Sequence, residues 1–302
     1  MPHPVTESYV SPAPGVRLWT ERRGAPDAPP LLLVMGAGAS GIGWPEPLVD
    51  ALAERHHVIR YDHRDTGRST AAYDAHPYRL ADLAGDLLAV LDGLGVGRAH
   101  AVGLSLGGML LQMALADHPE RFLSATLMGT CALSERPYVA PDGTVTAAGD
   151  LPSIAPQVLE LWARPVEDHG LEAELDRRVE HWRVLGGSRL PFDAAYFRDL
   201  ERAVIAHTGS YAASTAHARA DDSGMLRTDA LARNEVPTLV IAAPEEPVFP
   251  PPHPQHIAHV VGNARLVEIP GMGHALPPAV HGPLAEAVLQ HTAGAAAGVT
   301  PS

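Results

Sequence analysis

The sequence predicts an α/β fold in which a doubly wound, mostly parallel sheet is interrupted by an α-helical lid insertion. Short, continuous apolar runs alternate with helical patterns through residues 1–133. The alternation stops over residues 134–222 and then resumes. Because both faces of a parallel sheet are covered by helices, its strands are apolar throughout. We therefore expect a core made of residues 1–133 and 223–302, with residues 134–222 lying as a lid over the carboxyl ends of the strands.

Each core element is predicted from the spacing of its apolar residues. Residues 31–34 are Leu-Leu-Leu-Val, which is typical of a buried strand, whereas residues 80–94 repeat apolar positions every three or four residues, as on one helix face. The predicted strands are residues 31–34, 57–61, 99–104, 123–128, 236–242 and 264–269. The predicted helices are residues 47–55, 80–94, 106–116, 255–261 and 283–291. The Ala- and Gly-rich tail from Thr292 to Ser302 is expected to fray.

Composition excludes several classes of function. The net charge of −13 argues against nucleic acid or an anionic membrane as the main partner. All 22 basic residues are Arg, so chemistry that needs a lysine, such as Schiff-base formation or a P-loop, is excluded. Cys131 is the only cysteine, which rules out an intrachain disulfide and thiolate metal clusters. With neither an apparent signal peptide nor a long apolar segment, we expect a cytoplasmic protein that needs no cofactor and no metal.

A nucleophile motif stands between a predicted strand and a predicted helix. Residues 103–107 read Gly-Leu-Ser-Leu-Gly, a match to G-x-S-x-G. A sharp strand-to-helix turn holds such a serine in a strained conformation, and the glycines leave room for the close approach of the backbone. The helix N-terminus also directs N–H groups toward developing negative charge. Ser105 is therefore predicted to be a nucleophile.

A serine nucleophile needs a base and an acid that orients the base. His274 lies in a Gly-rich loop just after the last predicted strand, at the same sheet edge as Ser105. Two glutamates follow the preceding predicted strand, and we choose Glu246 as the acid, with Glu245 as the reserve. The oxyanion hole is predicted to use the backbone N–H groups of Leu106 and Ala37.

The order of these segments resembles the α/β-hydrolases over nearly the whole chain. Within that family, residues 33–36, 60–69, 103–107 and 269–277 are similar to the methylesterases of anthracyclines such as aclacinomycin. The resemblance implies a serine methylesterase of antibiotic biosynthesis that hydrolyses the carbomethoxy ester of an aromatic polyketide, sometimes with later decarboxylation. It also implies the roles given above to Ser105, His274, Ala37 and Leu106. The family acid is normally aspartate, so Glu246 is one methylene longer than the pattern.

The predicted partner is therefore a small aromatic ester, and the oligomeric state is left open. The insertion is rich in aromatic residues on which a flat ligand could stack. The substrate-binding residues proposed from the sequence are Met35, Gly36, Trp162, Trp182 and Phe192.

Other interpretations remain open. Residues 36–41 spell G-x-G-x-x-G, and Asp62 follows 21 residues later, as in a dinucleotide site; the prolines after the motif argue against it because they delay the helix to about Glu46. His253, His256 and His259 are spaced like metal ligands, but we interpret them as a solvated helix face. The fold could also serve a non-hydrolytic cyclase or decarboxylase with a weakened triad, or a general esterase for small esters.

Overall fold

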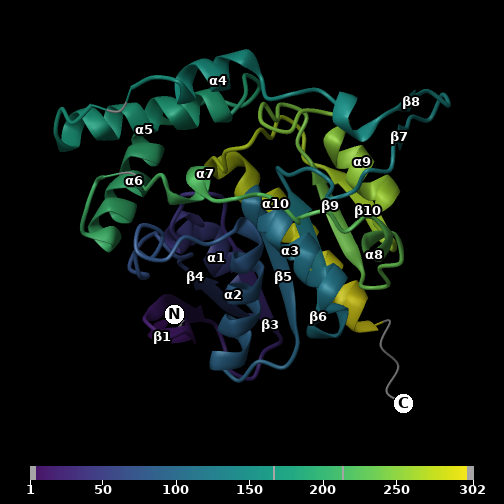
Figure 1. The fold of residues 1–302 in the computed structure, drawn as a ribbon, viewed down its shortest axis with the longest axis horizontal. Coiled ribbons are helices and arrows are strands. Elements are labelled where there is room, and N and C mark those ends of the chain that lie inside the picture. Colours follow the sequence, from purple (N-terminus) through teal and green to yellow (C-terminus); the bar gives the residue numbers. More distant parts are fainter. Residues whose placement is uncertain (1–4, 166, 213, 298–302) are drawn as a thin grey trace.

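The computed structural model describes residues 5–165, 167–212 and 214–297 and has an eight-stranded sheet at its centre (Figure 1). The strand order is β1-β2-β4-β3-β5-β6-β9-β10. Strands β1 and β2 run antiparallel to their neighbours, and the others are parallel. The strands are β1 (Val5–Ala13), β2 (Val16–Arg23), β3 (Pro30–Val34), β4 (His57–Tyr61), β5 (Ala99–Leu104), β6 (Phe122–Met128), β9 (Thr238–Ala242) and β10 (Ala264–Glu268). The predicted α/β fold class is confirmed, with β1 and β2 as an addition that the sequence reasoning missed.

Helices cover both faces of the sheet because the strands are apolar on both sides. In β3, Leu31 and Leu33 contact one helical layer, while Leu32 and Val34 contact the other. The first layer consists of α1 (Glu46–Ala53) and α10 (Pro278–Ala297). The second consists of α2 (Leu80–Gly93), α3 (Leu106–Asp117), α8 (Thr228–Ala232) and α9 (His253–Val260).

Between β6 and β9 the chain leaves the sheet, and we call residues 134–222 the insertion. It contains a two-stranded hairpin, β7 (Tyr138–Val139) and β8 (Val145–Thr146), which the helical patterns did not predict. Its helices are α4 (Pro156–Trp162), α5 (Leu171–Leu185), α6 (Ala194–Thr208) and α7 (Ala216–Arg219). Figure 1 shows α4, α5 and α6 gathered in one group at one side of the molecule. A separate apolar cluster, including Val158, Val179 and Phe197, joins this group to Val248 and Ala275 of the core.

Two details of the sequence prediction were wrong. The tail does not fray from Thr292, because α10 continues to Ala297 and the buried Thr292 hydroxyl lies 2.9 Å from His56 Nε2. The end of the tail, residues 298–302, lies outside the described residues. The histidines of α9 do not all form a solvated face, since His256 is buried and its Nε2 donates to the Arg136 carbonyl at 2.7 Å. This bond ties the insertion to the core.

Buried histidines are expected to make the fold acid-sensitive. Burial lowers the pKa of His56 and His291 below the ordinary value of 6.5 and that of His100 to about 4. The unfolded chain therefore binds more protons than the folded chain between these values, so stability falls as the pH drops from about 6.5 to about 4. We expect His100 alone to account for roughly 2–3 kcal/mol of this loss, since one pKa unit corresponds to about 1.4 kcal/mol. Urea unfolding from pH 7 to pH 4 tests this: His100→Gln should flatten the profile, and an equally steep profile in that variant would contradict it.

Candidate active site

Ser105 lies at the sharp turn between β5 and α3. Its backbone has φ 56° and ψ −122°, which is a strained conformation for a residue with a side chain. Gly103 and Gly107 make the turn possible: a Cβ on Gly103 would overlap the Gly107 carbonyl, and a Cβ on Gly107 would overlap the Val34 carbonyl. The turn therefore presents the serine at the carboxyl end of β5, at the N-terminus of α3.

His274 and Glu246 form a buried pair. Nδ1 of His274 lies 2.8 Å from both carboxylate oxygens of Glu246. Oε1 of Glu246 also accepts the backbone N–H groups of Val248 (2.8 Å) and Phe249 (3.2 Å). Burial raises the pKa of the Glu246 carboxyl, but His274 and these donors outweigh it and hold the pKa below its ordinary value. The carboxylate therefore stays charged and keeps the proton of His274 on Nδ1, which leaves Nε2 as an acceptor.

The reserve acid, Glu245, faces elsewhere. Its carboxylate accepts the backbone N–H of Ser188 at 3.1 Å and the Ser188 hydroxyl at 2.9 Å, and it pairs with Arg189. No contact to His274 is found for it within the described residues. The geometry therefore favours Glu246, whose longer side chain still reaches the imidazole.

One predicted oxyanion donor, Leu106, directly follows Ser105, and the other, Ala37, lines the same cavity as Ser105. Gly36 approaches the serine closely, since a Cβ on Gly36 would lie 3.2 Å from Ser105 Cβ. Neither the Ala37 N–H nor the Leu106 N–H has an acceptor among the described residues. Two backbone donors, next to the serine in the chain and in the loop packed against it, are thus unpaired, as an oxyanion hole requires.

A cavity of about 380 Å³ joins these groups to the insertion. Ser105 and His274 line it together with Met35, Gly36 and Ala37, and the insertion adds the predicted residues Trp162 and Trp182. Phe192 is not among the lining residues: its ring stacks on Phe197 at a centroid distance of 5.0 Å. Leu106 is also absent from the lining, and its predicted role rests on its place directly after Ser105 at the N-terminus of α3.

The sequence reasoning missed the polar groups that α5 and α6 bring to this cavity. Glu201 accepts Trp182 Nε1–H at 2.6 Å and Arg178 at 2.8 Å. Trp162 Nε1–H donates to His181 Nε2 at 3.1 Å, which places the proton of the neutral His181 ring on Nδ1. Burial and the nearby Arg177 lower the pKa of His181 to about 4. The i, i+3, i+4 and i+7 spacing of residues 178, 181, 182 and 185 is the signal that could have revealed this face.

The dinucleotide interpretation finds no support in the geometry. The carboxylate of Asp62 is used internally: it accepts the Ser40 hydroxyl at 2.5 Å and the Gly41 N–H at 2.8 Å. The first α-helix after the glycines begins only at Glu46. The glycine loop is therefore held by Asp62 rather than opening a helix toward a pyrophosphate.

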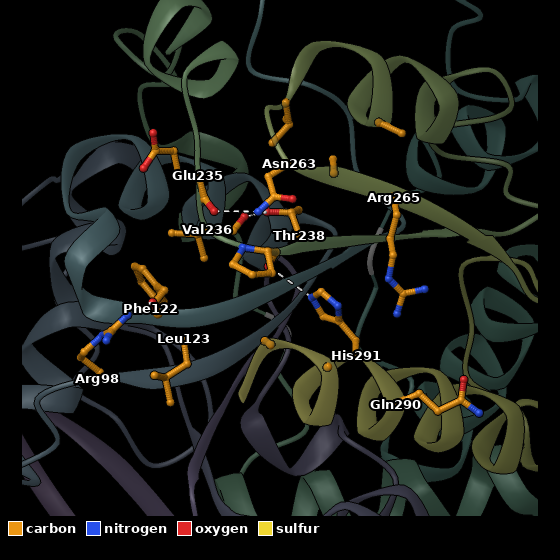
Figure 2. A pocket seen from close by; sticks show the side chains of 16 residues that line it. Arg98, Phe122, Leu123, Glu235, Val236, Thr238, Asn263, Arg265, Gln290 and His291 are labelled. Carbon is orange, nitrogen blue, oxygen red and sulfur yellow. Dashed lines mark hydrogen bonds between the residues drawn. The ribbon is translucent and has the colours of Figure 1, made fainter. Parts of the chain in front are cut away.

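A second, wider hollow of about 950 Å³ lies at the amino ends of the strands (Figure 2). In it, Asn263 donates to the Glu235 carbonyl and His291 to the Pro237 carbonyl. None of the predicted catalytic residues lines it. Within the described residues, no cluster of three or more metal-ligating side chains is found, and no helix is long and apolar enough to cross a membrane.

Comparisons with known proteins agree with this geometry. The profile of the alpha/beta hydrolase fold family matches residues 29–277. The chain is 42% identical over 292 residues to rhodomycin D methylesterase DnrP of Streptomyces peucetius, covering 93% of this chain and 96% of that protein. It is 43% identical to rhodomycin D methylesterase DauP of Streptomyces sp. (strain C5), with the same coverage. Among solved structures, a hydrolase from Pseudomonas aeruginosa PA01 superposes with a TM-score of 0.63 at 28% identity, covering 95% of this chain and 98% of that one.

Proposed function

The chain belongs to the α/β-hydrolase family, and from this premise we propose that it is a serine carboxylesterase that hydrolyses the methyl ester of an anthracycline-type aromatic polyketide. The observation that carries the proposal is the His274–Glu246 pair, whose histidine lines the same cavity as Ser105. The substrate class is supported by the identity of more than 40% to two rhodomycin D methylesterases across almost the full length of both proteins.

The proposed reaction has two balanced steps. In the first, Ser105 Oγ attacks the ester carbonyl while His274 Nε2 takes its proton, and the carbonyl oxygen becomes an oxyanion held by the Ala37 and Leu106 N–H groups. The intermediate collapses, and His274 passes the proton to the departing methoxide, which leaves as methanol. In the second step His274 removes a proton from water, the hydroxide attacks the acyl-enzyme, and the proton returns to Ser105 as the acid leaves.

The insertion supplies the surface for the rings. Trp162 and Trp182 line the cavity, and their indole N–H groups already donate to His181 and Glu201. The two indoles, of which Trp162 is half-exposed, can therefore offer apolar ring surface while their N–H groups keep hydrogen-bond partners. Contacts of this kind, remote from the ester, orient the carbonyl at Ser105 and lower the barrier.

A panel of methyl esters tests the substrate class. It should contain a glycosylated anthracycline, its aglycone and a simple aliphatic ester, with the products identified by mass spectrometry. We expect loss of the methyl group from the polycyclic members, at a kcat/KM at least about 100-fold above that of the aliphatic ester, because only they reach the tryptophans. A further loss of the carboxyl group would reveal decarboxylation.

Two outcomes would contradict the proposal. Efficient turnover of the aliphatic ester alone would indicate a general esterase. Conversion of a polyketide without release of methanol would indicate a non-hydrolytic enzyme on the same fold.

A further inference from the structure

Residues 35–40, which we call the oxyanion loop, are held by two buried histidines. The Gly38 N–H donates to His217 Nδ1 at 2.9 Å, and His217 Nε2 donates to the Arg64 carbonyl at 2.9 Å. His63 Nε2 donates to the Met35 carbonyl at 2.9 Å. The two imidazole rings meet edge to face, with their centroids 5.7 Å apart. One histidine therefore holds the start of the loop and the other its middle.

The partners of His217 fix its protonation state. A backbone N–H can only donate, so Nδ1 must carry a lone pair; a carbonyl can only accept, so Nε2 must carry the proton. Burial lowers the pKa of this imidazole, which favours the same neutral form. His217 is thus a neutral Nε2–H tautomer bridging two backbone segments.

The oxyanion loop has few bonds of its own. Its internal hydrogen bond, from the Ala39 N–H to the Gly36 carbonyl, is long at 3.4 Å. Gly38 has φ +67°, a left-handed conformation, and a glycine can adopt other backbone conformations at little cost. The orientation of the Ala37 and Gly38 peptides therefore depends on the partner that the Gly38 N–H finds outside the loop.

We propose that His217 is a positioning residue of the oxyanion hole: by accepting the Gly38 N–H, it aims the neighbouring Ala37 N–H at the oxyanion formed on Ser105. The proposal rests on the proposed esterase function. His217 belongs to α7 of the insertion and is 179 residues away from Gly38 in the chain. Docking of the insertion thereby completes the catalytic machinery as well as covering the substrate.

A second contact couples the same two regions. His207 of α6 lies with Nε2 2.7 Å from Asp62 Oδ2. The other oxygen of this carboxylate, Oδ1, accepts hydrogen bonds from the Ser40 hydroxyl, at the end of the oxyanion loop, and from the Gly41 N–H. The insertion therefore contacts the oxyanion loop in two ways. His217 bonds to the loop directly, and His207 is connected to it through the Asp62 carboxylate.

Two near-isosteric variants separate the bonds of His217. In His217→Asn the amide oxygen lies near the position of Nδ1 and can still accept the Gly38 N–H. In His217→Gln the amide nitrogen reaches the position of Nε2 and keeps the bond to Arg64 but not the one to Gly38. We expect His217→Gln to lower kcat by roughly 10–100-fold with little change in KM, and His217→Asn to stay within a few fold of the parent. The affinity for a trifluoromethyl ketone analogue of the ester, which forms an oxyanion on the serine, should fall in parallel with kcat.

His256 supplies the matched control. It is also a buried histidine that bridges the insertion and the core, but it bonds the Arg136 carbonyl and does not line the cavity. His256→Asn and His256→Gln should leave kcat and the affinity for the ketone unchanged, even where they lower the melting temperature. Nitrogen NMR of histidine-labelled parent protein should show a neutral Nε2–H tautomer for His217 at pH 7.

The proposal is overturned if His217→Asn and His217→Gln lose kcat equally, or if His217→Gln retains it. An Nδ1–H tautomer or a charged ring in the parent would also overturn it, and that measurement needs no variant to fold. Failure of the esterase function itself looks different: the parent enzyme would then show no reaction with a fluorophosphonate at Ser105.

Discussion

Replacing Ser105 with alanine is expected to lower kcat/KM for a polycyclic methyl ester by about 10⁴-fold or more, as in other serine triads. The reason is that His274 and the oxyanion donors remain but have no oxygen to activate. Release of methanol and formation of the acid should both be measured, since the two products come from different steps. The cavity should still bind the substrate, so KM is expected to change far less than kcat.

Ser134→Ala is a suitable control for this change. Ser134 is buried, whereas Ser105 is partly exposed; the Ser134 hydroxyl accepts the Arg136 N–H at 3.2 Å, and Ser134 does not line the catalytic cavity. This variant should keep parental activity. If Ser105→Ala also kept most of its activity, the serine mechanism would be wrong.

Replacing Glu246 with glutamine is expected to lower kcat by roughly 10³–10⁴-fold. Glutamine keeps the size of the side chain but not the charge that holds the proton on Nδ1 of His274 and stabilises the imidazolium. Steady-state kinetics with a polycyclic methyl ester measures the effect, and KM should change little.

The neighbouring glutamate is the control for Glu246. Glu245 accepts its hydrogen bonds from Ser188, so Glu245→Gln should stay within about twofold of the parent, as is usual for a group without a part in the transition state. A strong loss in Glu245→Gln with no loss in Glu246→Gln would reassign the acid. No loss in either variant would favour a non-hydrolytic reaction.

The parallel strands could be predicted because each is a continuous apolar run buried on both faces. Strand β1 could not be predicted in this way, since it forms the edge of the sheet and of its nine residues only Val10 is fully buried. Its backbone pairs with β2, and β2 pairs on its other side with β4, which lies far along the chain. The pairing of an exposed edge strand leaves little periodic signal in the sequence.

The residues of the candidate site also fall into two groups: those that a local motif predicts and those that only the tertiary structure brings to the site. Ser105 and His274 could be predicted as candidates because local motifs place them after strands, and Glu246 because it follows the preceding strand. The spacing of residues 178, 181, 182 and 185 marks one face of a helix, but it does not show that this face meets the catalytic cavity. His217 carries no local signal, since its position is set by how the insertion packs on the core. A contact between residues 38 and 217 depends on the tertiary structure and on no local pattern.

Peptide mapping after reaction with a fluorophosphonate tests the central claim most directly. Such a probe reacts with a serine only when a base and an oxyanion hole activate it. The account predicts a single adduct, on the peptide that contains Ser105, and none in Ser105→Ala. An unmodified Ser105 in a protein that still hydrolyses the ester, or an adduct on another residue, would contradict it.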